Sequence, residues 1–180
     1  MAVPTFKYHP DPIATKSIVA SDVECICCGK KRGFIYAGPV FAEDELADSL
    51  CPWCIADGSA HERFKAEFTD SAGVNSYGRT PPVPKSVIEE VSFRTPGFMG
   101  WQQEHWVTCC DDAAAYLGRA GKQELETKWP TAIPGLMEEA AMTAEQWENY
   151  VQHMDKDGSP TAYIFRCLHC EKLLGYSDCD

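Results

Sequence analysis

The sequence predicts an α+β fold made of zinc-knuckle β-hairpins, in which a tight turn carries a pair of cysteines, with short flanking helices. Three observations predict it. Cysteine pairs recur along the 180-residue chain, short segments rich in β-branched and aromatic residues lie beside them, and the helical segments are short. Elements of this length bury little surface, so we expect bound metal to supply part of the stability.

Strands are expected where β-branched and aromatic residues cluster next to a cysteine pair. Residues 33–37 follow the first pair and residues 162–165 lead into the last one, so each is expected to form half of a hairpin. A third strand is expected within the aromatic and glycine-rich segment 93–106.

Five short helical segments are expected between these strands. The clearest start is at Thr143, because Thr143-Ala144-Glu145-Gln146 has the spacing of a capping box, and this helix is expected to run to about Met154. Another helix is expected to begin at Pro84 or Lys85. The remaining segments are 43–48, 55–68, and one that starts at Asp111 or Asp112 and ends at Leu117.

The proline-containing segment 75–84 has the composition of a linker. It divides the chain into an N-terminal lobe, residues 1–75, and a C-terminal lobe, residues 76–180, each with its own cysteine cluster. We expect two zinc-centred lobes in one compact unit, and a single continuous domain is the alternative.

Two C-x₂-C pairs give the strongest site signal. Cys25 and Cys28 form one pair, Cys51 and Cys54 form the other, and 22 residues lie between them. Each C-x₂-C turn directs two sulfurs at one ion, and Zn²⁺ prefers four tetrahedral sulfur or nitrogen ligands. We therefore predict a Cys₄ zinc site with no open coordination position.

Thiol-redox chemistry is the alternative for Cys51 and Cys54, because Cys51-Pro52-Trp53-Cys54 resembles a disulfide-exchanging dithiol. Two features argue against it. Residues 45–50 do not form a buried hydrophobic strand before the motif, and a second C-x₂-C pair competes for the role. Cys27 is expected to be a spare thiol rather than a fifth ligand.

An internal repeat predicts a second zinc site. Residues 25–34 and 167–176 both read C-x₂-C-x-K-x₂-G followed by an aromatic residue, so Cys167 and Cys170 are expected to form a second knuckle.

The expected partners of this second knuckle are Cys109 and Cys110, although adjacent cysteines bind one ion only with a strained backbone. His105 and His169 are alternative ligands for the same site, and Cys179 is expected to be a bystander.

The charge of the chain limits its partners. The formal net charge is −11, and four thiolates around one Zn²⁺ carry −2, so two such sites would bring the total to about −15. This charge opposes binding to nucleic acid and favours a basic protein partner. The sequence shows neither a membrane-length apolar run nor a secretory signal, which predicts a cytoplasmic location.

No catalytic motif accompanies the cysteines, so we predict a protein that is not an enzyme. Pro52-Trp53-Cys54 is not preceded by the His-x-Glu of zinc deaminases. His61-Glu62 lacks a second histidine at metalloprotease spacing, and nucleophile-elbow, phosphate-loop and dinucleotide-binding motifs are absent.

Several segments closely resemble the CbrC-like family of uncharacterised bacterial proteins. They are residues 51–60, Trp101-Gln102 with Trp106, and residues 165–178, and the resemblance begins at residues 6–10 and runs nearly to the C-terminus. It brings no established enzymatic activity with it. The namesake of that family is associated with tolerance to a DNase-type colicin, so the resemblance implies an immunity-like protein that neutralises a nuclease toxin.

An acidic surface suits that role, because it can occupy the basic substrate groove of a nuclease. The candidate contact residues are all carboxylates: Glu43, Asp44, Glu45, Asp48, Asp111, Asp112, Glu138 and Glu139. A zinc-ribbon adaptor in stress response or transcription is the alternative.

Overall fold

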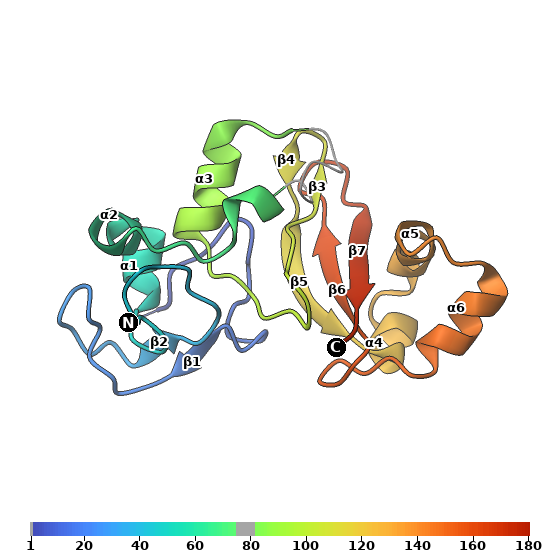
Figure 1. The fold of residues 1–180 in the computed structure, drawn as a ribbon, viewed down its shortest axis with the longest axis horizontal. Coiled ribbons are helices and arrows are strands. Elements are labelled where there is room, and N and C mark those ends of the chain that lie inside the picture. The colour runs from blue at the N-terminus through green and yellow to red at the C-terminus, as the bar shows by residue number, and fades with distance from the viewer. Residues whose placement is uncertain (1, 75–81) are drawn as a thin grey trace.

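The computed structural model describes residues 2–74 and 82–180 (Figure 1). An antiparallel sheet near the middle of the molecule contains β5 (Ala115–Ala120), β6 (Thr161–Arg166) and β7 (Leu173–Asp178), in that order. The first part of the chain lies on one side of this sheet, and the helices that follow β5 lie on the other. Short helices together with antiparallel strands confirm the predicted α+β class.

The N-terminal elements among the described residues are two short strands, two short helices and a 3₁₀ turn: β1 (Ile18–Ala20), β2 (Phe34–Tyr36), α1 (Pro52–Ala56), α2 (Ser59–Phe64) and the turn (Ser71–Gly73). β1 and β2 pair antiparallel, and β2 confirms the strand expected at 33–37. The helix expected at 55–68 is split in two because Gly58 adopts a left-handed conformation, with φ of 83°.

Residues 43–48 form an irregular loop, so the helical turn predicted there is wrong. The loop has one buried apolar residue, Leu46, while its carboxylates are exposed. A helix would place Asp44 and Asp48 four residues apart on the same face, where like charges repel. One apolar anchor does not compensate for that repulsion.

Helix α3 (Lys85–Arg94) begins after Pro84, as predicted. Most of the predicted linker, residues 75–81, lies outside the described residues. The strand expected within 93–106 is wrong: residues 93 and 94 end α3, and the rest of the segment is a loop apart from an isolated bridge between Trp106 and Val74. Pro96 has no N–H to donate to a strand ladder.

A short hairpin follows, made of β3 (Thr108–Cys109) and β4 (Asp112–Ala113). The helix predicted from Asp111 or Asp112 to Leu117 is therefore wrong. Residues 112–116 are all buried, whereas a surface helix buries only one stripe of its side chains. Extended chain running through the core satisfies that burial.

The C-terminal helical elements are α4 (Lys122–Thr127), a 3₁₀ turn (Pro130–Ala132), α5 (Ile133–Glu139) and α6 (Ala144–Val151). The predicted capping box of α6 is confirmed, because the Thr143 hydroxyl accepts a hydrogen bond from the Gln146 N–H and the Gln146 side chain accepts one from Thr143 N–H. The helix ends at Val151, before the predicted Met154.

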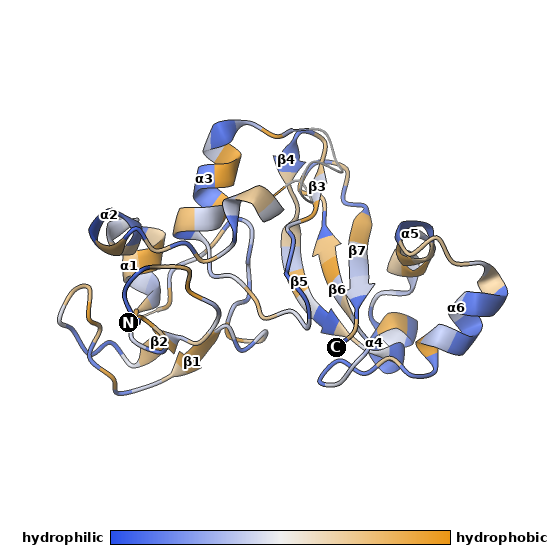
Figure 2. Cartoon of the chain, in the orientation of Figure 1, coloured by the Kyte–Doolittle hydropathy of each residue, from blue (hydrophilic) through white to orange (hydrophobic). Residues whose placement is uncertain are grey.

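The buried hydrophobic residues form three clusters. Figure 2 shows how hydrophobic and hydrophilic residues are distributed along the elements. One cluster lies among the N-terminal elements and includes three cysteines. A second, around the fully buried Trp106, packs against one face of the β5–β6–β7 sheet. The third joins the sheet to α4, α5 and α6 through residues such as Leu136 and Ile164.

Candidate metal centres

Four cysteines from two segments of the N-terminal region converge on one point. The Sγ atoms of Cys25, Cys28, Cys51 and Cys54 lie within 4.8 Å of one another. The Cys25–Cys54 and Cys28–Cys51 sulfur pairs are each 3.8 Å apart, and the Cys51–Cys54 pair is 3.6 Å apart. Sulfurs bound tetrahedrally to one Zn²⁺ at about 2.3 Å are about 3.8 Å from each other. The cluster therefore has the size of a tetrahedral zinc site.

Local backbone geometry brings these sulfurs together. In the first knuckle, Cys25 N–H donates to the Lys30 carbonyl, and Gly29 N–H donates to the Cys25 carbonyl with Gly29 at φ of 64°. Cys51 is the N-cap of α1, and Pro52 starts the helix. Cys51 and Cys54 consequently lie one helical turn apart on the same side of α1.

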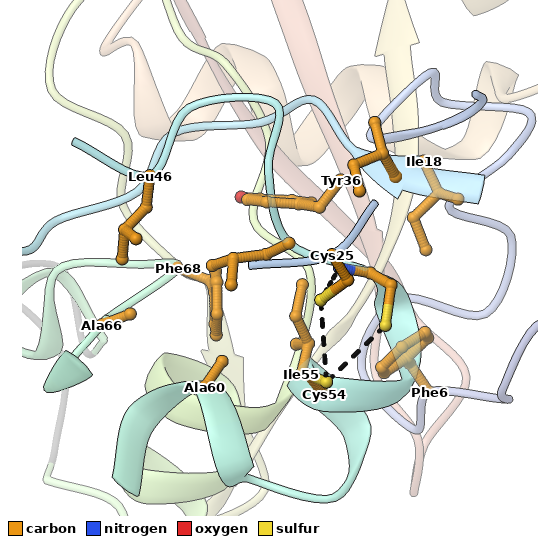
Figure 3. Close-up of a cluster of buried hydrophobic side chains, with 13 residues drawn as sticks. Phe6, Ile18, Cys25, Tyr36, Leu46, Cys54, Ile55, Ala60, Ala66 and Phe68 are labelled. Atoms are coloured by element: carbon orange, nitrogen blue, oxygen red, sulfur yellow. Dashed lines mark hydrogen bonds between the residues drawn. The ribbon is translucent and has the colours of Figure 1, made fainter. Parts of the chain in front are cut away.

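The N-terminal cluster lies inside the hydrophobic core. Figure 3 shows Cys25 and Cys54 pointing toward each other beside Phe6 and Ile55. Cys25, Cys51 and Cys54 are 0, 1 and 2% exposed, whereas Cys28 is partly exposed. An ion here would be shielded from water by packed side chains.

Neighbouring sulfurs in this cluster shift one another's pKa in opposite directions. The sulfur contact with Cys51 and backbone N–H donors lower the pKa of Cys25 to about 4, against the effect of burial. Contact with Cys25, together with burial, raises the pKa of Cys51, and burial raises the pKa of Cys54. One thiolate thus opposes ionisation of its neighbours, and a bound dication would remove that opposition.

A second set of four sulfurs lies between the β3–β4 hairpin and the turn after β6. The Sγ atoms of Cys109, Cys110, Cys167 and Cys170 lie within 4.8 Å of one another. The Cys109 sulfur is 3.7 Å from that of Cys110 and 3.8 Å from that of Cys170. These spacings also fit one tetrahedral zinc ion.

The turn of the β3–β4 hairpin lets adjacent cysteines reach the same point. Cys109 pairs with Asp112 across the hairpin, which leaves Cys110 and Asp111 as the two turn residues. Their φ angles are 54° and 58°. Two-residue hairpin turns of type I′ require positive φ at both positions, which glycine, asparagine and aspartate adopt most readily and which is strained for cysteine. The strain expected for adjacent ligands is therefore located in this turn.

The second knuckle repeats the backbone pattern of the first. Cys167 N–H donates to the Lys172 carbonyl, as Cys25 N–H does to Lys30, and Glu171 at φ of 60° takes the place of Gly29. Burial would raise the pKa of Cys167, but N–H donors from Cys170 and His169 outweigh it and lower that pKa to about 6. The sequence repeat thus corresponds to a structural repeat.

The histidines considered as alternative ligands make other contacts. His169 Nε2 is 2.9 Å from Asp112 Oδ2. The ring of His105 stacks on Tyr176, with ring centroids 3.6 Å apart. Cys110 supplies the fourth sulfur of the set instead.

Asp112 forms a polar network that the sequence did not reveal. Its carboxylate accepts hydrogen bonds from Lys7 at 2.9 Å and from the Tyr8 hydroxyl at 2.6 Å, and it contacts His169. Burial would raise the pKa of Asp112, but these donors lower it to about 2. Asp112 lies in β4, so its predicted role as a helix cap is wrong. It is only 5% exposed, which also excludes the predicted role as a surface contact. In the sequence, only its position two residues after Cys110 indicated that Asp112 lies near the second site.

The two remaining cysteines lie outside both sets. Cys27 Sγ is 3.6 Å from the Ser59 hydroxyl, and Cys179 is exposed near the C-terminus.

Among the described residues, each helix is too short or too polar to cross a membrane.

Comparisons with known proteins give a family match over nearly the whole chain. Residues 3–179 match the uncharacterised protein family UPF0167. The chain is 47% identical over 179 residues to UPF0167 proteins of Mycobacterium bovis and Mycobacterium tuberculosis, covering 98% of this chain and 93% of each relative. A UPF0167 protein of Pseudomonas aeruginosa is 43% identical over 169 residues, covering 93% of this chain and 92% of that protein. No solved structure matches the chain.

Proposed function

The chain belongs to the uncharacterised UPF0167 family, and we propose that it is a zinc-stabilised binding protein whose partner is a basic protein. The observation that carries the proposal is the pair of four-sulfur sets, each drawn from two separate segments of chain. We propose two zinc-centred lobes, residues 1–75 and 76–180, with one set in each.

Zinc is the ion that fits both sets best. Soft thiolate ligands in a tetrahedral S₄ arrangement favour Zn²⁺ over harder cations such as Mg²⁺ or Ca²⁺. Four thiolates complete the coordination shell, so no position remains for water or substrate. The ions therefore stabilise the fold, and the protein acts through its surface.

Metal content and thiol reactivity test this part of the proposal. Protein purified without chelators should carry two zinc ions per chain, measured by elemental analysis. Of its ten cysteines, Cys27 and Cys179 should react at once with a thiol reagent, the C-terminal set should react more slowly, and the N-terminal set should react only after zinc is chelated. Metal-free protein would refute the proposal. Immediate reaction of Cys51 and Cys54 would instead support the thiol-redox alternative.

The partner surface that we propose is the acidic loop, defined as residues 43–48. Its four carboxylates, Glu43, Asp44, Glu45 and Asp48, are exposed. Leu46 is 2% exposed and anchors the loop to the N-terminal core. A fixed group of like charges attracts a complementary basic surface and speeds association. The basic groove of a nuclease toxin, which the CbrC-like resemblance suggests, is such a surface.

Charge neutralisation of the acidic loop tests the partner. The variant Glu43→Gln, Asp44→Asn, Glu45→Gln, Asp48→Asn should fold, because these side chains are exposed. We expect it to bind the nuclease domain of a DNase-type colicin at least about tenfold more weakly than the unaltered chain at low salt. The matched control is Glu138→Gln, Glu139→Gln, which removes exposed carboxylates from α5. Failure of the unaltered chain to bind the nuclease domain would refute the immunity role.

A further inference from the structure

The two sulfur sets differ sharply in exposure. Three cysteines of the N-terminal set are at most 2% exposed and belong to a hydrophobic cluster. In the C-terminal set, Cys110 and Cys170 are exposed, Cys109 is partly exposed, and only Cys167 is buried. Solutes in water therefore reach the sulfurs of one set and not those of the other.

Exposure matters because zinc-bound cysteines keep their thiolate character. Thiolates, not thiols, are the nucleophiles that peroxides oxidise, and their susceptibility follows thiolate character and exposure. Both sets would hold thiolates when metal is bound, so exposure decides between them. The C-terminal set combines both requirements.

We propose that the C-terminal set is an oxidation site, at which hydrogen peroxide joins Cys109 and Cys170 in a disulfide and releases the zinc ion. The N-terminal set keeps its ion under the same conditions. This inference rests on the proposed zinc sites, and it adds a chemical reactivity that separates one from the other.

The chemistry needs one peroxide molecule for each disulfide. The exposed Cys170 thiolate attacks one peroxide oxygen, the O–O bond breaks, and Cys170 becomes a sulfenic acid while hydroxide leaves. The Cys109 thiolate, with its sulfur 3.8 Å away, then attacks the Cys170 sulfur. An S–S bond forms, a second hydroxide leaves, and two protons from solvent convert both hydroxides to water. Two sulfurs have lost two electrons, and the peroxide has gained them.

Geometry favours Cys170 over Cys110 as the partner of Cys109. A disulfide between the adjacent residues Cys109 and Cys110 would close a small, strained ring that contains their peptide bond. Cys170 instead approaches from the second knuckle, at nearly the same sulfur distance. After oxidation only Cys110 and Cys167 remain as ligands, and two thiolates do not hold zinc tightly.

The fold should survive this release. The new disulfide would itself link the β3–β4 hairpin to the second knuckle, and the Asp112–His169 contact joins the same two segments. The N-terminal core is built on its own cysteines and does not include this set. Oxidation would therefore change the metal content and the local surface without unfolding the chain.

The test uses the full chain with Cys27→Ser and Cys179→Ser, which removes the two cysteines outside the sets. The protein is loaded with zinc and treated with hydrogen peroxide, while released zinc is followed with a colorimetric chelator. We expect half of the bound zinc to be released at least about tenfold faster than the other half. Peptide mapping after thiol alkylation should show a Cys109–Cys170 disulfide and reduced Cys25, Cys28, Cys51 and Cys54.

Several outcomes would overturn the inference. Release of both ions at one rate, release of neither, or a disulfide within the N-terminal set would each contradict it. Adding Cys170→Ser should abolish the disulfide, and if that variant fails to fold, the mapping of the parent protein decides alone. The zinc content before oxidation separates the two proposals: fewer than two ions would count against the proposed function, not against the reactivity.

Discussion

Asp112 and His169 meet at 2.9 Å between the two segments that supply the C-terminal cysteines. Asp112 lies two residues after Cys110 on the β3–β4 hairpin, and His169 lies between Cys167 and Cys170 in the second knuckle. Lys7 and Tyr8 bind the same carboxylate. The contact therefore positions both cysteine-bearing segments and ties them to the start of the chain.

Replacing Asp112 by asparagine should destabilise the protein. Oδ1 would still accept from Tyr8, but an amide NH₂ in place of Oδ2 would face the donor Lys7 and the ring of His169. We expect the free energy of unfolding to fall by about 2–4 kcal/mol and the affinity of the C-terminal site for zinc to fall about tenfold. Urea denaturation and zinc competition with a chelator measure the two effects.

The matched control for this substitution is Asp111→Asn, in the neighbouring turn position. Asp111 is exposed, so its substitution should change the unfolding free energy by less than about 0.5 kcal/mol. Equal effects of the two substitutions would show that Asp112 contributes through its charge alone and not through its buried contacts.

His9 should make stability depend on pH. It is fully buried, with Nδ1 2.7 Å from the Pro96 carbonyl and Nε2 2.7 Å from the Thr15 hydroxyl. Because a carbonyl only accepts, Nδ1 carries the proton and Nε2 accepts from Thr15. Burial lowers the pKa of His9 from 6.5 to about 4. Between these values the unfolded chain binds a proton that the folded chain does not.

The contribution of His9 to the free energy of unfolding is therefore fully present above pH 6.5 and is lost as the pH falls toward 4. The loss amounts to about 3 kcal/mol at most. Urea unfolding from pH 7 to pH 4.5 of the unaltered chain and of His9→Asn measures it. Asparagine keeps a donor for Pro96 but does not titrate, so the free-energy difference between the two proteins should shrink as the pH falls. Zinc loss in acid affects both alike. A difference that stays constant would contradict the prediction.

Cys54→Ser should remove the N-terminal zinc and unfold much of the chain. Binding of a structural zinc contributes about 10–16 kcal/mol in zinc-finger peptides, whereas whole domains are stable by only about 5–15 kcal/mol. We expect zinc content to fall from two ions to one and the melting transition to drop or disappear. Cys27→Ser is the control, since Cys27 lies between Cys25 and Cys28 in the first knuckle but outside the sulfur set. An unchanged melting temperature for Cys54→Ser would contradict the structural role of the ion.

Features set by neighbours along the chain could be predicted from the sequence. The capping box at Thr143 and the start of α3 after Pro84 depend on a few adjacent residues. The C-x₂-C pairs are also local, because a turn fixes the distance between their sulfurs. The sequence could therefore name six of the eight cysteines from these pairs alone, and it named Cys109 and Cys110 only as expected partners of the last pair.

Features set by distant residues could not be predicted. The carboxylate of Asp112 is held by Lys7, 105 positions away in the sequence, and no local pattern indicates such a contact. The same aspartate reads locally as a helix cap, but burial of Ala113, Ala114 and Tyr116 selects an extended chain instead. Burial on both sides of a segment depends on the whole fold.

Gly97 should tolerate no side chain, because it lies where the loop after α3 meets the N-terminal core. Its N–H donates to the Tyr36 hydroxyl at 3.1 Å, and a Cβ would collide with the Phe68 carbonyl oxygen. That oxygen cannot easily move, since Phe68 N–H is itself bonded to the Ser92 carbonyl. We expect Gly97→Ala to lower the free energy of unfolding by about 1–3 kcal/mol.

Gly135→Ala is the contrasting substitution. Gly135 lies within α5, and a Cβ there would meet only the Leu173 carbonyl oxygen at 3.9 Å, an ordinary contact. Alanine is favoured over glycine inside a helix by about 1 kcal/mol, so this variant should be more stable than the unaltered chain. If the close approach at Gly97 is correct, urea denaturation should show a lower free energy of unfolding for Gly97→Ala and a higher one for Gly135→Ala. Two changes of the same sign would mean that the Phe68 segment can shift to make room.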